Sequence, residues 1–480
     1  MTTAPALVPH RRRHRLVGVA VSAAVALPLM VSGGNTSAGA WDGGGEDPVV
    51  AWNAIAGDAA LASCIAPAND PLHESRMYAM THVAVHDALN AIDRRSEPYA
   101  FHPPPRPAAS PLAAVAAAAH GVLVPALQDL PDIFPPECIA AGVQLVEDAY
   151  DDALAEIPDG RAKTQGIALG RGAAATIVAL RSADGSDTLM VDPNYPQGDE
   201  PGEYRFTPGT PFAFAPGWGD VAPFVLKDAS QFGARRPYRV TSRRYTRDFN
   251  EVKRLGGDGT PTSPSARTPD QTQIALFWVD SSPLSWNRIA RTVSTSAGLD
   301  TWENARLFGL LNLAMADGYI GSFETKYDFN FWRPVTAIQL AADDGNPDTV
   351  ANPSWMPLVT TPPVPDHDSA HAVEGAVAAE VFRRFFRTDR MSFEACSLTL
   401  PEGQQCDDAT PVLRSFDRFS DAADENGESR VLVGFHFRHA VDDGVHHGKR
   451  IATRAVGRFL RPVSGRGTAP PDWASSLMLA

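Results

Sequence analysis

Apolar residues recur at helical spacing along most of the chain, and this pattern predicts an all-α fold. The clearest case runs from about Leu72 to Ile92, where apolar side chains return every three to four residues. The alternation of apolar and polar residues that marks half-buried strands is scarce. Further helices are expected at about 49–65, 111–127, 135–156, 161–183, 268–320 with a break near Gly298, 371–386, and 416–459 as one long helix.

The segment from Gly185 to about Pro269 interrupts this pattern, because proline, glycine and aromatic residues dominate it. A single helix is expected inside it, around Tyr245–Leu255. A loop of this length in a compact protein usually carries function or wraps the core. We expect it to lie over the helical body and to shape the mouth of a site. The predicted organisation is a helical half with this wrap (41–275), a second helical half (276–462) and a tail (463–480).

Residues 1–40 have the features of a secretory signal peptide. Four arginines between Arg11 and Arg15 precede an apolar run from Leu16 to Val31, and Ala38-Gly39-Ala40 has the form of a cleavage site. The apolar run is short for a membrane span. We therefore expect secretion, by either the Sec or the Tat route, and no membrane span in the mature chain.

The net charge and the cysteines indicate which partners and which cellular compartment to expect. The net charge is −14, and removal of the four arginines of residues 1–40 makes it −18, so nucleic-acid binding is disfavoured. The four cysteines suit an oxidising compartment. Cys396 and Cys406 bracket a short loop and are expected to pair, which would leave Cys64 with Cys138; the other two connectivities remain open.

The most informative short stretch is Pro365–His371, which directly precedes an apolar helical run. Ser369, Ala370 and His371 place a hydroxyl, an approachable backbone N–H and an imidazole where a helix should begin. Helix N-termini carry unpaired N–H groups and partial positive charge, so they bind oxyanions. The alternative is an ordinary helix cap followed by a polar histidine.

Two basic pairs flank this stretch in the sequence. Lys326 and Arg333 are seven residues apart, which predicts one helical face two turns apart, and nearby aromatic residues suggest that they are buried. Arg430 and His436 are six apart and would not share a helical face. Each pair alone could be a solvated patch. We predict that both pairs and Pro365–His371 together form one pocket for an anion.

A metal cation is a competing prediction. His439, Asp443 and His447 are spaced i, i+4, i+8, which would place them on one face of a helix, with His367 or His371 as further ligands. The plainer interpretation of this spacing is a surface stripe.

Taken together, the three clusters resemble a known superfamily. Lys326-x6-Arg333-Pro334, Ser369-Ala370-His371 and Ser429-Arg430-x5-His436, in this order, are similar to the motifs of vanadium-dependent haloperoxidases and type 2 phosphatidic acid phosphatases. Met80–Ile92 and Phe331–Ile338 also resemble the secreted bacterial haloperoxidases. The resemblance covers most of residues 50–460 and implies an all-helical fold of two packed bundles.

The resemblance implies a role for each matching residue. His436 would bond vanadium, and His371 would be the acid–base group that helps to load peroxide. In the phosphatase branch, His436 would attack phosphorus and His371 would protonate the leaving group. The oxygens of vanadate would be held by five groups: Lys326, Arg333, Arg430, the Ser369 hydroxyl and the Ala370 N–H.

Three positions depart from the family pattern. Ala370 replaces a glycine but keeps its N–H. Asp368 replaces a proline and would oppose an anion unless it turns away to cap the helix. Ala440 replaces an aspartate that orients His436, and Asp443 lies too far along the helix to substitute for it. Because a nucleophilic histidine depends more on that acid than a metal-binding one does, the loss favours the peroxidase branch.

We therefore predict a secreted, vanadate-dependent enzyme that oxidises halide with hydrogen peroxide and halogenates or oxidises small organic compounds. The alternatives are a secreted acid phosphatase with a phosphohistidine intermediate and an oxyanion-binding protein without catalysis. The sequence carries no prediction of the oligomeric state.

Overall fold

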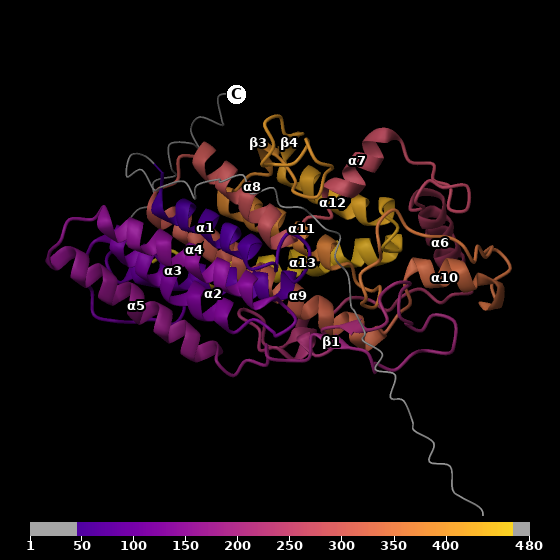
Figure 1. Cartoon of the computed structure of the whole chain (residues 1–480), viewed down its shortest axis with the longest axis horizontal. Coiled ribbons are helices and arrows are strands. Elements are labelled where there is room, and N and C mark those ends of the chain that lie inside the picture. Colours follow the sequence, from indigo (N-terminus) through magenta and orange to yellow (C-terminus); the bar gives the residue numbers. More distant parts are fainter. Residues whose placement is uncertain (1–45, 464–480) are drawn as a thin grey trace, which may run out of the picture. The chain divides into compact units, whose positions relative to one another are not determined.

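The computed structural model describes residues 46–463, and within this range the all-α prediction is confirmed (Figure 1). The range holds thirteen α-helices and two two-stranded antiparallel sheets. All of these residues belong to one compact unit, Ala40–Ala480. The predicted signal peptide and nearly all of the predicted tail lie outside the described residues, and the predicted boundary near residue 275 stays a prediction.

The first bundle is formed by α1 to α5 together with part of α9 (Thr301–Phe329), which packs against α1 and α2. Helix α3 packs against α2, α4 and α5, and α1 packs against α4. Small residues allow the closest of these contacts: a Cβ at Gly170 would lie 2.4 Å from the Ala114 carbonyl oxygen. Proline at the first turn starts four of the helices, as its fixed φ favours. The five are α1 (Pro48–Ala62), α2 (Pro71–Asn90), α3 (Pro111–Gln128), α4 (Pro136–Ala155) and α5 (Arg161–Arg181).

Helix α3 is the one described helix that is long and apolar enough to cross a membrane by length and composition. In this respect the prediction that no stretch after the signal peptide could do so is wrong. The helix is rich in alanine and more than half buried, and it packs among α2, α4 and α5. These contacts are those of a core helix in a bundle.

Helix α9 (Thr301–Phe329) runs through both bundles, since it packs against α2 on one side and α11 and α13 on the other. Its start is fixed by a capping box in which Asp300 and Glu303 bond each other's backbone N–H groups. In the second bundle, α7, α8 and α13 pack against α11 or α12, whereas α10 packs against η3 and α6 (Arg243–Leu255). The elements are α7 (Pro269–Phe277), α8 (Ser282–Ser296), α10 (Pro334–Leu340), η3 (Ala341–Asp343), α11 (Ala370–Phe386), α12 (Phe419–Leu432) and α13 (Arg438–Arg458).

The loop-rich segment 185–269 lies over the helical body as predicted. The buried carboxylate of Asp317, on α9, accepts the backbone N–H groups of residues 224–226 at 2.6–2.7 Å, and this ties the segment to the bundle. Helix α6, the helix expected around Tyr245–Leu255, packs against α10, α12 and α13. The elements of the segment are β1 (Val191–Asp192), β2 (Ala213–Phe214), η1 (Trp218–Asp220), η2 (Ala229–Phe232) and α6 (Arg243–Leu255).

The single helix predicted from Phe416 to Phe459 is wrong. The chain there begins with a strand, and the helical part is divided into α12 and α13 by the link 433–437. Gly434 makes the break: its φ is +88°, and a Cβ there would lie 2.5 Å from the Gly256 carbonyl oxygen. The strand, β4 (Arg414–Arg418), pairs with β3 (Arg390–Ala395) in a hairpin that the pattern did not reveal.

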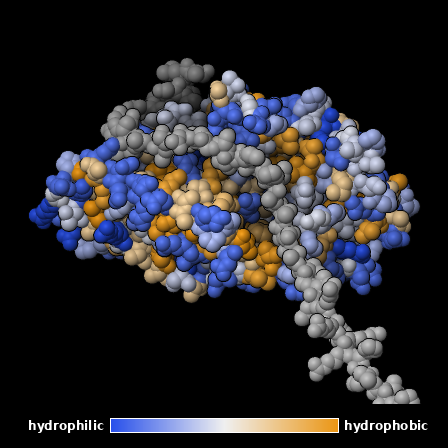
Figure 2. All heavy atoms as spheres, in the orientation of Figure 1, coloured by the Kyte–Doolittle hydropathy of each residue, from blue (hydrophilic) through white to orange (hydrophobic). Residues whose placement is uncertain are grey.

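Both expected disulfides are present, Cys64–Cys138 and Cys396–Cys406. Because Cys396–Cys406 lies between β3 and β4, it closes the long connection of that hairpin. On the face drawn in Figure 2, hydrophilic and hydrophobic residues are interspersed, and hydrophilic ones cover the larger part.

The contact between α11 and α13 should be the most sensitive to added volume. A Cβ at Gly448 would lie 2.2 Å from the Val373 carbonyl oxygen, so Gly448→Ala is expected to destabilise the fold by about 1–3 kcal/mol in urea unfolding. Gly457, on the same helix, has no heavy atom within 4 Å of such a Cβ. Gly457→Ala should therefore be neutral or stabilising by up to about 1 kcal/mol, and equal losses in both variants would contradict the packing.

Candidate functional site

Lys326 lies in the last turn of α9 and is almost completely buried. Its ammonium group donates hydrogen bonds to the backbone oxygens of Pro365 and Asp366, both at 3.1 Å, and of Asp368. Burial, with Arg333 nearby, lowers the pKa of Lys326 to about 7. These hydrogen bonds hold the backbone of the loop 365–368 in place, and the ammonium group adds positive charge beside it.

Arg333 does not share a helical face with Lys326, so the prediction from their spacing is wrong. Helix α9 ends at Asn330, a left-handed residue with φ +47°, and Arg333 caps the next helix, α10, at Pro334. The two cations are still neighbours because the chain turns back. The Arg333 guanidinium donates to the carbonyl oxygens of Val364 (2.6 Å) and Phe435 (2.9 Å).

His436 lies in the link between α12 and α13, where the ring is buried and held on both nitrogens. Nδ1 is 3.0 Å from Oδ1 of Asp366, and Nε2 is 3.0 Å from Nη1 of Arg333. A carboxylate can only accept, so the ring proton is on Nδ1 and Nε2 keeps a lone pair. Burial and then Arg333 hold the pKa of His436 well below its usual value, so the ring is neutral at pH 7.

Asp366 is the functional residue that sequence reasoning missed. It supplies the orienting carboxylate that Ala440 lacks, from a position 70 residues before His436. Burial raises the pKa of Asp366 to about 6, against the attraction of Arg333 and Lys326. The argument that loss of this acid favours the peroxidase branch is therefore wrong, because the acid is present.

Ser369 is the N-cap of α11, but its side chain does not cap the helix. Its hydroxyl is buried and has no hydrogen-bond partner among the described residues. The backbone explains why the hydroxyl is free: the Ser369 N–H bonds the Ala440 carbonyl, which fixes the residue without using its side chain. The Ala370 N–H follows in the first turn, where no helical partner exists.

His371, in the first turn of α11, is partly exposed. It bonds the backbone of Asp280, while its Nε2 is buried and has no partner in the described structure. Burial and then Arg430 hold the pKa of His371 well below its usual value, so its free nitrogen can accept a proton at neutral pH.

Arg430 lies in the last turn of α12, where its guanidinium stacks on Phe435 and donates to the Trp278 carbonyl at 2.7 Å. Its Nε is buried and unpartnered within residues 46–463. Burial, followed by repulsion from Arg333, lowers the pKa of Arg430 to about 9. The link between α7 and α8 thus positions both Arg430 and His371.

The structure brings these predicted residues together. His436 interacts electrostatically with Arg333, Lys326, Arg430 and His371, and each of these interactions lowers its pKa. Three buried basic residues, Lys326, Arg333 and Arg430, outnumber the two carboxylates that act on them, Asp366 and Asp368, and an excess of buried positive charge is costly without an anion. Ser369 Oγ and Arg430 Nε are buried without partners. These donors fit a tetrahedral oxyanion such as vanadate.

Asp368 turns away from the cluster, but not to cap the helix. Its carboxylate bonds Nδ1 of His447 at 2.8 Å and the Ser322 hydroxyl at 2.6 Å. This pairing also corrects the competing prediction, because His447 does not join His439 and Asp443 in one cluster. The charge of Asp368 is therefore no obstacle to an anion.

Comparisons with known proteins agree with this geometry. Residues 306–465 match the family model described as the VCPO second helical-bundle domain. The vanadium chloroperoxidase of Curvularia inaequalis is 25% identical over an alignment of 308 positions, which covers 52% of this chain and 48% of that protein. The chain therefore spans about half the length of this relative.

Two crystal structures share the fold over most of the chain. A bacterial vanadium-dependent iodoperoxidase matches with a TM-score of 0.70 and 24% identity, over 88% of this chain and 98% of that one. A bacterial vanadium-dependent chloroperoxidase in its apo form matches with a TM-score of 0.64 and 16% identity, over 82% and 94%. The second bundle therefore matches the model of this haloperoxidase domain, and the chain shares the fold of these two vanadium-dependent peroxidases.

Proposed function

We propose that this protein is a vanadate-dependent peroxidase that uses hydrogen peroxide to oxidise halide and so halogenates or oxidises small organic compounds. The observation that carries the proposal is a set of buried polar atoms without partners among residues 46–463: the donors Ser369 Oγ and Arg430 Nε, and the acceptor Nε2 of His371. Buried polar groups are normally paired, so unpaired ones that face one cluster indicate a missing ligand.

Each residue has a defined task in this proposal. Arg333 and Arg430 would hold vanadate oxygens with charged N–H groups, and Lys326 would add charge while keeping the loop 365–368 in place. Ser369 and the Ala370 N–H would donate at the start of α11. His436 would bond vanadium through Nε2. Arg333, whose N–H now points to this nitrogen, would instead donate its hydrogen bond to a vanadate oxygen.

Vanadate supplies the Lewis acidity that activates peroxide towards a halide. His371 would take the proton of the incoming peroxide on its free Nε2, and its low pKa keeps that nitrogen unprotonated at neutral pH. His371 is partly exposed, so peroxide and halide would reach the cluster beside this residue.

Phosphatase activity is the second candidate, and the contact between Asp366 and His436 favours it. A histidine nucleophile needs a carboxylate that fixes its tautomer and stabilises its charge, and Asp366 supplies both at 3.0 Å. In that reaction Nε2 of His436 would attack phosphorus and His371 would protonate the leaving group. Binding of oxyanions without catalysis is the third candidate.

One assay separates the three candidates. The purified chain, freed of bound anions, is given a brominatable dye, bromide and hydrogen peroxide with and without vanadate, and in parallel a phosphate ester. Bromination that requires vanadate supports the proposal. Ester hydrolysis without bromination supports the phosphatase, and vanadate binding without either reaction supports the third candidate.

Secretion is part of the proposal. It is supported by the signal-peptide pattern of residues 1–40 and by two disulfides, which persist in oxidising compartments.

A further inference from the structure

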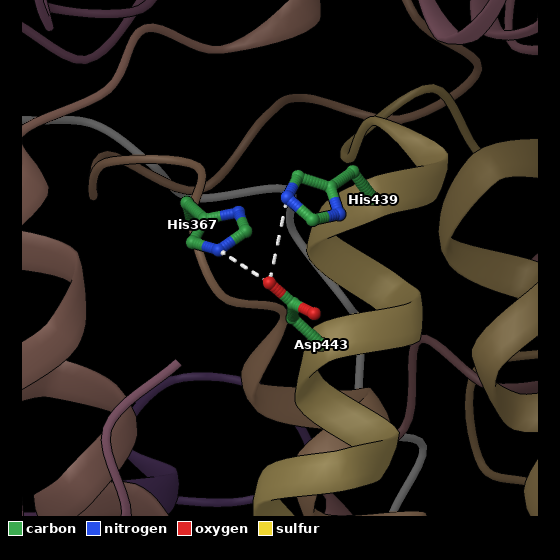
Figure 3. A group of neighbouring side chains, drawn as sticks. All are labelled: His367, His439 and Asp443. Atoms are coloured by element: carbon green, nitrogen blue, oxygen red, sulfur yellow. Dashed lines mark ion pairs between the residues drawn. The ribbon is translucent and has the colours of Figure 1, made fainter. Parts of the chain in front are cut away.

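A second cluster of potential metal ligands includes one residue of the loop 365–368. It consists of His367 from the loop and of His439 and Asp443, one helical turn apart on α13 (Figure 3). All three side chains are more than nine-tenths buried. Their potential ligand atoms lie within 4.8 Å of one another.

The two distances from Asp443 to the histidines are longer than good hydrogen bonds and match those between neighbouring ligands of a cation. Oδ2 of Asp443 is 3.3 Å from Nε2 of His367 and 3.4 Å from Nε2 of His439. Hydrogen bonds between these groups would be about 2.7–3.0 Å long. Bonds of about 2.0–2.2 Å from nitrogen and oxygen to a tetrahedral zinc ion place neighbouring ligand atoms about 3.3–3.5 Å apart.

The ligand atoms are also available. Nε2 of His367 and Oδ2 of Asp443 are buried and have no hydrogen-bond partner in the described part of the chain. Nε2 of His439 bonds the Arg236 carbonyl at 3.2 Å, a weak contact that a metal bond would replace. An unpaired carboxylate oxygen facing two imidazoles in a buried space indicates a missing cation.

The surroundings hold the rings in place. Tyr238 stacks on the ring of His439 with centroids 3.7 Å apart, and the backbone N–H of His439 bonds Asp248 at 3.2 Å. A cavity of about 10 Å³, lined by both histidines but not by Asp443, has room for about one water molecule, which would be the fourth ligand. Packing of this kind fixes ligand directions before the metal binds.

We propose that His367, His439 and Asp443 bind a divalent transition-metal ion of the zinc class, with one water molecule completing a tetrahedral site. The ion would fix the loop 365–368, because His367 stands between Asp366, which orients His436, and Asp368, which pairs with His447. The site is independent of vanadate, and its role is to position that loop.

The test uses the full-length chain, stripped with a chelator and free of any affinity tag and of vanadate. Zinc is titrated by calorimetry, and cobalt(II) is added as a spectroscopic probe whose visible absorption distinguishes four from six ligands. We expect one zinc ion per chain, a four-coordinate cobalt spectrum and a melting temperature that rises with zinc concentration.

Matched variants locate the site. His439→Gln and Asp443→Asn should each weaken zinc binding by at least about a hundredfold. His446→Gln, which changes an exposed histidine of the same helix, should bind zinc as the unmodified chain does. Absence of stoichiometric zinc and cobalt binding by the unmodified chain would overturn the proposal even if a variant fails to fold. So would equal affinity in His439→Gln and His446→Gln.

Discussion

His436→Ala is expected to abolish attachment of vanadate and, with it, vanadate-dependent bromination, by about a thousandfold or more. Nε2 of His436 carries a lone pair on a neutral ring, which is held between Asp366 and Arg333. Alanine removes the bond to vanadium but leaves the oxygen-binding groups. Vanadate affinity by calorimetry and initial bromination rates measure the two effects separately.

Two further variants are compared with His436→Ala: a second variant of the site and a control outside it. Lys326→Ala should weaken the affinity for vanadate and for phosphate together, because it removes charge and releases the loop 365–368. His446→Ala should change neither, since His446 is exposed on α13. If His436→Ala and Lys326→Ala both bind vanadate as tightly as the unmodified chain, the assignment of the site is wrong.

Asp366→Asn is expected to lower vanadate affinity about 10–100-fold while leaving the fold intact. Asp366 accepts the Nδ1 proton of His436 and thereby keeps the lone pair on Nε2. An amide can donate to Nδ1 instead, which favours the tautomer whose Nε2 carries the proton and cannot bond a metal.

If Asp366 acts by positioning His436, another carboxylate at this position should recover part of the lost vanadate affinity. Asp366→Glu should restore part of the affinity, because a carboxylate is again within reach, whereas a purely structural role predicts no such rescue. Asp442→Asn, the same change at an exposed aspartate on α13, is the control and should behave as the unmodified chain. Unchanged vanadate affinity in Asp366→Asn would show that the ring is oriented by other groups.

Local sequence patterns predicted most of the helices, because helix formation depends mainly on residues that are close together in the sequence. The spacing of apolar residues gave the bounds of α2 and α3 within about two residues. The division of the last helix depends on Gly434, whose positive φ is set by the approach of Gly256 from a distant segment. The hairpin β3–β4 is short and its pairing is long-range, so its alternation was too brief to detect.

The site was predictable as a set of residues but not as a geometry. The motifs named Lys326, Arg333 and His436, yet spacing placed the first two on one helix, which in fact ends between them at Asn330. Asp366 was within the motif stretch without a role, because its contact with His436 bridges 70 residues. The same limit applies to His367, whose partners on α13 only folding brings near.

Helix α9 has a consequence for how the two halves of the protein can be separated. One of its faces is covered by α2 and another by α11 and α13, and Lys326 stands at its end. A fragment that starts inside α9, such as the segment matched by the family model, would leave the first of these faces uncovered. The half that carries the candidate site is therefore not expected to fold as an autonomous module, and insertions or fusions should be better tolerated at surface loops than at the boundary between the bundles.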